Sequence, residues 1–319
     1  MSVMDNVQKV VEAVAGDKLG DVSWNYDKVP DQSGKTFVVT GGSSGLGFEF
    51  CKQLAAKNAN VVLAARNVER SDDAIDNIRQ ETKAGKISFE HVDLASLKSV
   101  KDFADRVNSQ HPSLQCLINN AGVQIPEGME KTQDGIEVHI GVNFLGHFYL
   151  THLLLPKIQA SAPGSRIVFM SSPEESRGFV PWDDLTGKSI DRTSFDWYGA
   201  ANLCKLMVGK EIARRLEGSG VDLFVVQPGM TTTDLFRKMD FSKKESTAHN
   251  KLQQVGGQTL ENGAISTIYA ATEPSLQGKG GLWLGPYYTK TPIALNVFQT
   301  MPQEPGNDEA KDPAKSWAS

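Results

Sequence analysis

The fold is decided by residues 40–47, TGGSSGLG, which follow directly on the β-rich run at 36–40. A helical pattern begins at once, because Leu46, Phe50 and Leu54 fall on one helix face. Glycines permit a tight turn and let the backbone approach a ligand that a Cβ would exclude. A helix N-terminus adds free N–H groups and the positive end of its dipole, which together suit a phosphate. The position of this turn, between strand and helix, therefore predicts a dinucleotide-binding site.

Apolar, β-rich runs recur along the chain, and most of them are separated by segments of helical periodicity. They lie at 36–40, 61–65, 87–92, 114–119, 166–171, 221–226 and, more weakly, 282–284. Strands that alternate with helices predict βαβ units. Continuous apolar strands such as 37–39 suit a sheet that is covered on both sides. We therefore predict a Rossmann-type α/β fold, doubly wound, with a seven-stranded, mostly parallel sheet and helices on both faces.

The composition argues against several classes of protein. Lys and Arg number 33 and Asp and Glu 38, a net charge of −5, whereas a nucleic-acid binder would carry a basic excess. Cys51, Cys116 and Cys204 are far apart and lack metal-ligand spacing, so we expect reduced, buried thiols and no metal site. Asp5 and Lys9 interrupt the N-terminal stretch, so no cleavable signal is expected. No uncharged apolar run approaches the ~18–20 residues that cross a bilayer, and we expect a cytoplasmic protein without a transmembrane segment.

The residue after the second predicted strand indicates which dinucleotide is bound. An acidic residue there accepts hydrogen bonds from the ribose 2′-hydroxyl of NAD, whereas an Arg accommodates the 2′-phosphate of NADP. Here the strand ends in Arg66 and Asn67, and the next carboxylate is Glu69. Because a guanidinium binds phosphate through two charge-assisted hydrogen bonds, we predict NADP(H) as the cofactor.

The spacing Thr-Gly-x-x-x-Gly-x-Gly in this turn resembles that of the short-chain dehydrogenase/reductase family. The resemblance covers about residues 33–285 and includes further motifs in the family's order. It implies an oxidoreductase in which Asp93 and Leu94 contact the adenine and residues 120–122 border the adenosine. The full set of cofactor-binding residues implied in this way is Gly41, Ser43, Ser44, Gly45, Leu46, Gly47, Arg66, Asp93, Leu94, Asn120, Ala121, Gly122, Asn202, Lys205, Pro228, Gly229, Thr231 and Thr233.

Hydride transfer to a carbonyl needs a proton donor at the oxygen, and a phenol can serve when a neighbouring cation lowers its pKa. A nearby hydroxyl can polarise the same oxygen. The family supplies these groups as Asn, Ser, Tyr and Lys, with Tyr and Lys four residues apart on one helix. By this resemblance Tyr198 is the acid/base, Ser172 orients the substrate oxygen and Asn143 supports a proton-relay water.

The sequence departs from the family at the lysine. The fourth residue after Tyr198 is Asn202, and Lys205 stands at the seventh, so the two residues look exchanged. Both positions lie on the Tyr198 face of a helix, at about +40° and −20°, and Lys205 starts roughly 4.5 Å further along the axis. Because side chains lean toward the helix N-terminus, the Lys205 ammonium can reach back toward the vacated place. Either Lys205 replaces the usual catalytic lysine, or catalysis is weakened or lost while cofactor binding persists.

Two segments are predicted to border the substrate. The long insertion at 173–195 before Tyr198 resembles the retinol-dehydrogenase-like branch of the family. The segment that follows Thr233 is rich in Lys, Ser, Thr and Gln, and in this position we expect it to form a lid at about 231–262. Trp182, Phe195, Trp197, Phe236 and Met239 favour either an apolar pocket beside these segments or simple packing.

We therefore expect an NADP(H)-dependent oxidoreductase that interconverts a carbonyl and an alcohol on a small or medium apolar substrate, as a monomer or a homodimer. Two alternatives stay open: an NADPH-binding sensor or scaffold with little turnover, and a carbon–carbon double-bond reductase. A length of 319 residues would allow two domains at roughly 150 residues each, but the motif order places all seven strands in one. We expect a helical extension and connector at 1–33, with a helix at 4–15, a catalytic domain at 34–286 and a tail at 287–319.

Overall fold

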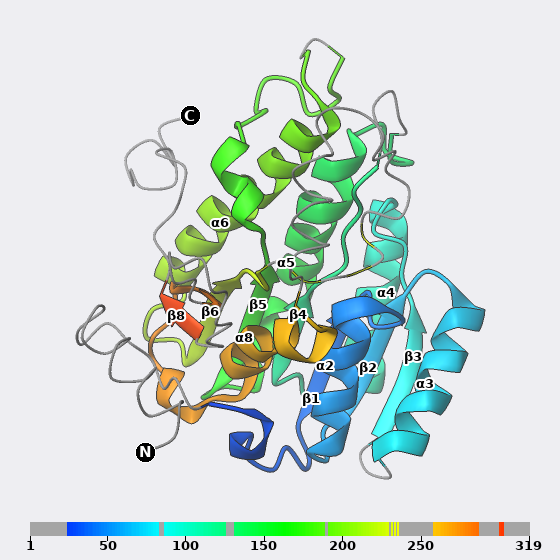
Figure 1. Cartoon of the computed structure of the whole chain (residues 1–319), viewed down its shortest axis with the longest axis vertical. Coiled ribbons are helices and arrows are strands. Elements are labelled where there is room, and N and C mark those ends of the chain that lie inside the picture. The colour runs from blue at the N-terminus through cyan, green and yellow to red at the C-terminus, as the bar shows by residue number, and fades with distance from the viewer. Residues whose placement is uncertain are drawn as a thin grey trace.

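A computed structural model of the protein describes residues 24–82, 86–125, 131–188, 191–229, 231, 233, 235, 258–286 and 300–302. The predicted N-terminal helix at 4–15, most of the predicted lid at 231–262 and most of the predicted tail at 287–319 lie outside these residues. The described residues form a central sheet with helices on both faces (Figure 1).

The sheet has its strands in the order β3-β2-β1-β4-β5-β6-β7-β8. They are β1 (Thr36–Thr40), β2 (Asn60–Ala65), β3 (Lys86–His91), β4 (Cys116–Asn119), β5 (Ser165–Met170), β6 (Val221–Val226), β7 (Trp283–Pro286) and β8 (Thr300–Pro302). Neighbours from β3 to β7 pair in parallel, and β8 pairs antiparallel with β7. The seven predicted strands and the Rossmann-type α/β class are confirmed. The sequence does not predict β8, because three residues ending in a proline carry no alternating pattern.

Helices cover the two faces of the sheet (Figure 1). On one face lie α2 (Gly45–Ala56), α3 (Val68–Thr82) and α8 (Leu260–Thr272), and on the other lie α4 (Leu97–Gln110), α5 (Gly146–Ala160) and α6 (Ser194–Arg215). Along β1, Phe37 and Val39 pack against the first set and Val38 packs against the second. This burial on both faces explains why the strands read as continuous apolar runs.

The segment that precedes α5 packs against the start of α6. A π-helical stretch, η3 (His139–Leu145), runs directly into α5, and such stretches are frequent at functional sites. Ile140 and Phe144 of η3 share an apolar cluster with Trp197 and Ala201 of α6. The 3-10 turn η4 (Pro173–Arg177) lies between β5 and α6 in the chain, and the turns η2 (Tyr26–Lys28) and η7 (Pro274–Leu276) complete the described helical elements.

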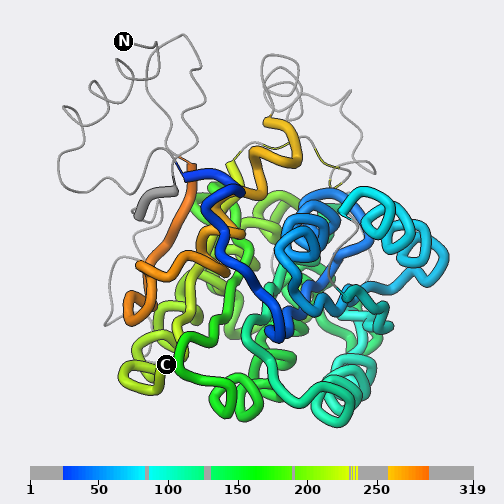
Figure 2. Tube along the Cα trace, turned by 90° about the horizontal axis from the view of Figure 1, so that it is seen from below, coloured from blue at the N-terminus to red at the C-terminus, as the bar shows by residue number. Residues whose placement is uncertain are grey.

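The first described residues pack beside the last helix of the domain (Figure 2). Trp24 Nε1 donates a hydrogen bond of 2.9 Å to Glu273 Oε2, and its ring meets Tyr269 edge to face at 5.3 Å. Trp24 and Val29 belong to the same buried cluster as α2 and α8. The core of the domain therefore includes residues that the sequence assigns to a connector.

The order in which successive strands are added to the sheet reverses at β1, which pairs with β2 on one side and β4 on the other. In open α/β sheets, ligands bind beyond the carboxyl ends of the strands at such a switch point. The glycine turn follows β1, and Asn119 ends β4 beside it. This topology places the predicted dinucleotide site between the two strands.

Candidate active site

A cavity of about 290 Å³ lies at the carboxyl ends of β1, β4 and β5. Most of the predicted site residues line it: Gly41, Ser44, Gly45, Leu46, Gly47, Arg66, Asn120, Ala121, Gly122, Asn143, Tyr198, Asn202, Lys205, Pro228 and Thr233. The other predicted residues lie outside this lining: Ser43, Asp93, Leu94, Ser172, Gly229 and Thr231. Lining residues that the sequence analysis does not name are Arg70, Val123, Gln124, Ile125, Met170, Ser171 and Leu235.

The glycine turn is packed too closely to carry side chains. Gly41 has φ +70°, and a Cβ added to it would lie 2.9 Å from Ala121 Cα. A Cβ on Gly47 would overlap the Gly41 carbonyl oxygen. These contacts explain the glycine spacing physically, since the turn must fold back on itself and also lie against the loop after β4.

The N-terminus of α2 is left open toward the cavity. Its N-cap residue Ser44 makes no side-chain capping bond, and the first turn contains no acidic residue. A Cβ on Gly45 would meet no atom closer than Thr233 Cβ, at 3.9 Å. Free N–H groups beside an open, glycine-lined space fit the pyrophosphate of a dinucleotide.

The charged groups that line the cavity are cations. Arg66 and Arg70 lie at the β2–α3 end, Lys205 comes from α6, and no Asp or Glu is among the described lining residues. A dinucleotide carries negative charge on its phosphates, so this wall complements it electrostatically. The charge distribution suits a ligand with several phosphates.

A buried hydrogen-bond chain connects the glycine turn to η3. Thr40 Oγ1 accepts from Asn120 N at 2.9 Å and Ala121 N at 3.0 Å, and it lies 2.9 Å from His147 Nε2. His147 Nδ1 lies 3.0 Å from the Asn143 carbonyl oxygen. Because a carbonyl only accepts, Nδ1 carries the proton, and Nε2 accepts from the Thr40 hydroxyl. One neutral imidazole thus links the cofactor turn to the segment that carries Asn143.

His147 is expected to make the protein less stable in mild acid. Burial lowers its pKa from 6.5 to about 3, so between these values the unfolded state binds the proton and the folded state does not. Stability is therefore present above pH 6.5 and is lost as the pH falls toward 3. Between pH 7 and pH 5 we expect the wild type to lose about 2 kcal/mol more unfolding free energy than His147→Gln, as measured by urea unfolding. Equal losses in the two proteins would contradict this assignment.

Asn143 holds the loop after β4 through its side chain. Its Oδ1 accepts from Val123 N at 2.8 Å, and its Nδ2 donates to the Val123 carbonyl at 2.9 Å. The side chain is almost fully buried. Both ends of the carboxamide therefore bind the backbone of a residue that lines the cavity.

Tyr198 lies buried in the cavity wall on α6. Burial raises the pKa of its phenol, while hydrogen bonding with the Ser172 and Asn202 side chains acts in the opposite direction. Ser172 also caps η4, since its Oγ accepts from Glu174 N at 3.3 Å. The structure thus brings the predicted serine to the predicted tyrosine.

The exchanged pair Asn202 and Lys205 faces the same cavity. Asn202 Nδ2 donates to the Tyr198 carbonyl oxygen at 2.9 Å. Lys205 Nζ donates to the Met170 carbonyl oxygen at the end of β5, and burial alone lowers the pKa of this ammonium to about 7. The lysine is therefore inside the site, with its ammonium bound to the β5 carbonyl.

The predicted residues outside the lining make local turn contacts. Asp93 Oδ1 accepts from Ala95 N at 3.0 Å, and Leu94 is buried. Thr231 Oγ1 donates to the Pro228 carbonyl at 3.2 Å, and Gly229 N donates to Gln227 Oε1 at 2.7 Å. Their roles toward a cofactor stay predictions.

Arg70 and Gln124, two lining residues that the sequence analysis does not name, differ in whether the sequence offers a signal for them. Arg70 lies in the first turn of α3, which begins at Val68, so a second basic residue close behind Arg66 is a signal that the sequence offers. Gln124 sits in the irregular loop after β4, where no periodic pattern marks an inward side chain. The inward side chain of Gln124 therefore could not be predicted from the sequence.

Further features of the described residues bear on the other expectations. Cys51, Cys116 and Cys204 are buried and form no disulfide bond among the described residues. No group of three or more His, Cys, Asp or Glu side chains in the described part could hold a metal ion. Across those same residues, every helix is too short or too polar to span a bilayer.

Comparison with known proteins places the chain in a family. The family model described as short chain dehydrogenase matches residues 35–244. The polyprenol dehydrogenase of Danio rerio is 36% identical over 273 residues, covering 84% of this chain and 83% of that protein. Retinol dehydrogenase 13 of Homo sapiens is 41% identical over 282 residues, covering 88% of this chain and 80% of that protein.

A solved structure agrees with the sequence comparison. An uncharacterised protein from Mycobacterium Paratuberculosis superposes with a TM-score of 0.70 at 29% identity, covering 92% of this chain and 93% of that one. The residues that the family model matches include the glycine turn and Tyr198, and the matches to the two dehydrogenases each cover more than four fifths of this chain. The chain therefore belongs to the short-chain dehydrogenase/reductase family of oxidoreductases, whose fold binds a nicotinamide dinucleotide, in its retinol-dehydrogenase-like branch.

Proposed function

We propose that the protein is an NADP(H)-dependent oxidoreductase that interconverts a carbonyl and an alcohol on a small or medium apolar substrate. One observation carries this proposal: Tyr198, hydrogen-bonded to Ser172, lines the same cavity as the glycine turn. A proton donor is thereby held beside a place that fits a dinucleotide. The names of the two relatives, a polyprenol dehydrogenase and a retinol dehydrogenase, support alcohol chemistry over reduction of a carbon–carbon double bond.

A bound nicotinamide would supply the hydride in reduction and accept it in oxidation. In reduction, Tyr198 breaks its O–H bond and gives the proton to the carbonyl oxygen, which takes the π electrons as the carbon gains the hydride. Ser172 donates a hydrogen bond to the same oxygen and stabilises the charge that develops there. Asn143 keeps the Val123 loop in place at the cavity wall. In oxidation, the phenolate of Tyr198 takes the hydroxyl proton.

The preference for NADP(H) rests on the two arginines near the end of β2. Arg66 and Arg70 line the cavity, and no carboxylate among the described lining residues could accept a hydrogen bond from a ribose 2′-hydroxyl. A 2′-phosphate would gain charge-assisted hydrogen bonds from the guanidinium groups. NAD(H) lacks this phosphate and would gain neither of these contacts.

The double variant Arg66→Ala/Arg70→Ala tests this preference. Loss of charge-assisted hydrogen bonds is expected to raise the dissociation constant for NADPH by about 10-fold to 100-fold and to leave that for NADH nearly unchanged. Quenching of protein fluorescence during titration with each cofactor gives both constants. Arg79→Ala, on the same helix but outside the cavity lining, serves as the control. Equal weakening for both cofactors would argue against a 2′-phosphate contact.

The contacts of Lys205 favour a second function, an NADPH-binding sensor with little turnover. Its ammonium binds the Met170 carbonyl oxygen, and burial raises the pKa of the Tyr198 phenol. NADPH oxidation over a panel of aldehydes and ketones separates the two functions. Turnover that depends on Tyr198 supports the oxidoreductase, and tight NADPH binding without turnover supports the sensor.

A further inference from the structure

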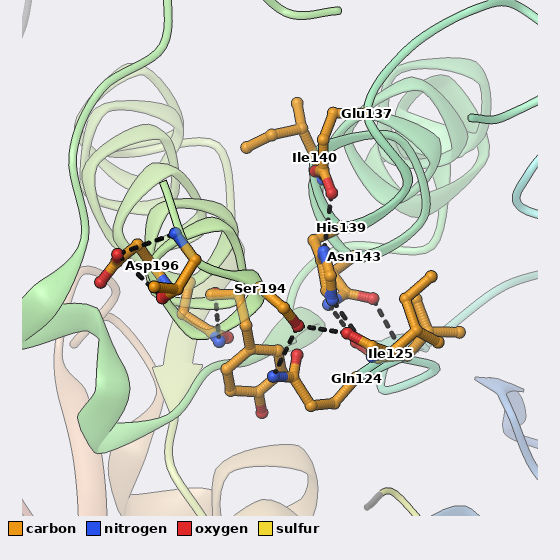
Figure 3. Close-up of polar contacts among 12 residues, drawn as sticks. Gln124, Ile125, Glu137, His139, Ile140, Asn143, Ser194 and Asp196 are labelled. Atoms are coloured by element: carbon orange, nitrogen blue, oxygen red, sulfur yellow. Dashed lines mark hydrogen bonds and ion pairs between the residues drawn. The ribbon is translucent and has the colours of Figure 1, made fainter. Parts of the chain in front are cut away.

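A chain of hydrogen bonds runs through the wall of the cavity from Glu137 to Ile125 (Figure 3). Ile140 N donates to Glu137 Oε2 at 2.9 Å, and His139 Nδ1 lies 2.7 Å from Glu137 Oε1. At the other side of the ring, Ile125 N donates to His139 Nε2 at 3.3 Å. Because Nε2 accepts, Nδ1 carries the proton and donates it to the carboxylate. The backbone of Ile125 is thereby anchored to η3.

The chain continues from Ile125 to Gln124 through Ser194. Ser194 Oγ donates its single proton to the Ile125 carbonyl oxygen, and Gln124 Nε2 donates to Ser194 Oγ at 3.3 Å (Figure 3). Since the serine has no second proton to give, the carboxamide must present its N–H group to Ser194. The opposite atom, Gln124 Oε1, is then directed away from this chain.

Gln124 Oε1 is a buried acceptor without a hydrogen-bond partner among the described residues. Gln124 is only 1% exposed and lines the same cavity as Tyr198. Ser194, which holds it, precedes Tyr198 by one turn of α6, a rise of about 6 Å. The serine that holds Gln124 and the proton donor therefore come from neighbouring turns of one helix, and Gln124 and Tyr198 line the same cavity.

We propose that Gln124 determines specificity by accepting a hydrogen bond from a hydroxyl on the carbon next to the reacting carbon, so that the preferred substrates are α-hydroxy ketones and, in oxidation, 1,2-diols. This inference rests on the proposed function of the same cavity. A buried acceptor left unpaired costs free energy, and a substrate hydroxyl removes that cost. Sites built around such a group reject analogues that lack it. The amide oxygen carries no charge to hold an ammonium, which favours a hydroxyl as the donor.

The test compares two ketones of equal heavy-atom count, 2-hydroxyacetophenone and propiophenone, in which a hydroxyl replaces a methyl group. The wild type is expected to reduce the hydroxy ketone with a kcat/KM at least about 10-fold higher. Gln124→Met keeps the length of the side chain and removes the acceptor, so it is expected to reduce that ratio at least about 10-fold. Gln133→Met, at an exposed glutamine outside the cavity, should keep the wild-type ratio.

A second variant and a second measurement keep the outcome decisive. Ser194→Ala removes the anchor of the carboxamide and is expected to lose part of the preference, which distinguishes positioning from simple loss of volume at Gln124. Calorimetric titration of the enzyme–NADP⁺ complex with each ketone gives the ratio of the two dissociation constants, which requires no turnover. If neither ketone is reduced but the hydroxy ketone binds more tightly in a Gln124-dependent way, the proposed reaction fails and this inference stands. A ratio near one in the wild type, or a ratio unchanged in Gln124→Met, overturns the inference.

Discussion

Tyr198→Phe is expected to lower the rate of carbonyl reduction by about 10³-fold and to leave NADPH binding nearly intact. The phenylalanine keeps the buried ring, which lies edge to face with His139 at 6.4 Å, and it removes only the hydroxyl that meets Ser172. The loss should fall on kcat, because the proton is needed at the reacting oxygen and not for holding the cofactor. Steady-state kinetics and a fluorescence titration with NADPH separate the two quantities.

The control for this change is Tyr149→Phe, at a tyrosine of α5 outside the cavity lining, which should keep wild-type kinetics. Full activity in Tyr198→Phe would remove the tyrosine from the mechanism. The pH dependence gives a further check on the wild type. Since burial raises the pKa of the phenol, the protonated form that reduction needs persists above neutral pH, and alcohol oxidation should rise with pH as phenolate forms.

The double variant Asn202→Lys/Lys205→Asn restores the order in which the family carries these two residues. It is expected to shift alcohol oxidation to lower pH. A cation within about 4–6 Å of a phenol lowers its pKa by about 1–3 units. Position 202 lies one turn from Tyr198, and the Asn202 side chain already contributes to the pKa of the phenol. The pH of half-maximal oxidation should therefore fall by about 1–3 units, and the rate at pH 7 should rise by at least about 10-fold. The pH–rate profiles of wild type and variant measure both effects.

The two single variants separate the roles within the pair. Lys205→Asn should weaken NADPH binding, since it removes a cation from the cavity wall. Asn202→Lys alone should place a second ammonium near that of Lys205 and disturb the positions of both side chains. An exchanged protein with slower oxidation and an unshifted profile would mean that Lys205 already acts on Tyr198, by a rotation that frees its ammonium from the Met170 carbonyl.

The glycine turn and the strands were predictable because their causes are local. A turn that must fit beside Ala121 tolerates only glycine at Gly41, and buried strands such as β1 need apolar side chains on both faces. The approach of Ser172 to Tyr198 follows from a family pattern that the chain retains.

The remaining features depend on contacts between distant segments. The carbonyl that receives the Lys205 ammonium belongs to β5, thirty-five residues earlier, and spacing along α6 says nothing about it. The inward side chain of Gln124 is fixed by Ser194, and Trp24 is fixed by Glu273. Side-chain rotamers chosen by such partners lie beyond what periodicity can predict.

The pairing of β8 with β7 has a consequence for how copies of the protein could meet. At that end of the sheet the outer strand is three residues long and finishes in Pro302, which has no N–H to offer. At the other end of the sheet, the edge strand β3 contains the charged residues Lys86 and Glu90. Short, proline-terminated and charged edge strands resist joining a neighbouring sheet. For the part of the chain that the structure describes, a continuous sheet across two molecules is therefore disfavoured at both ends.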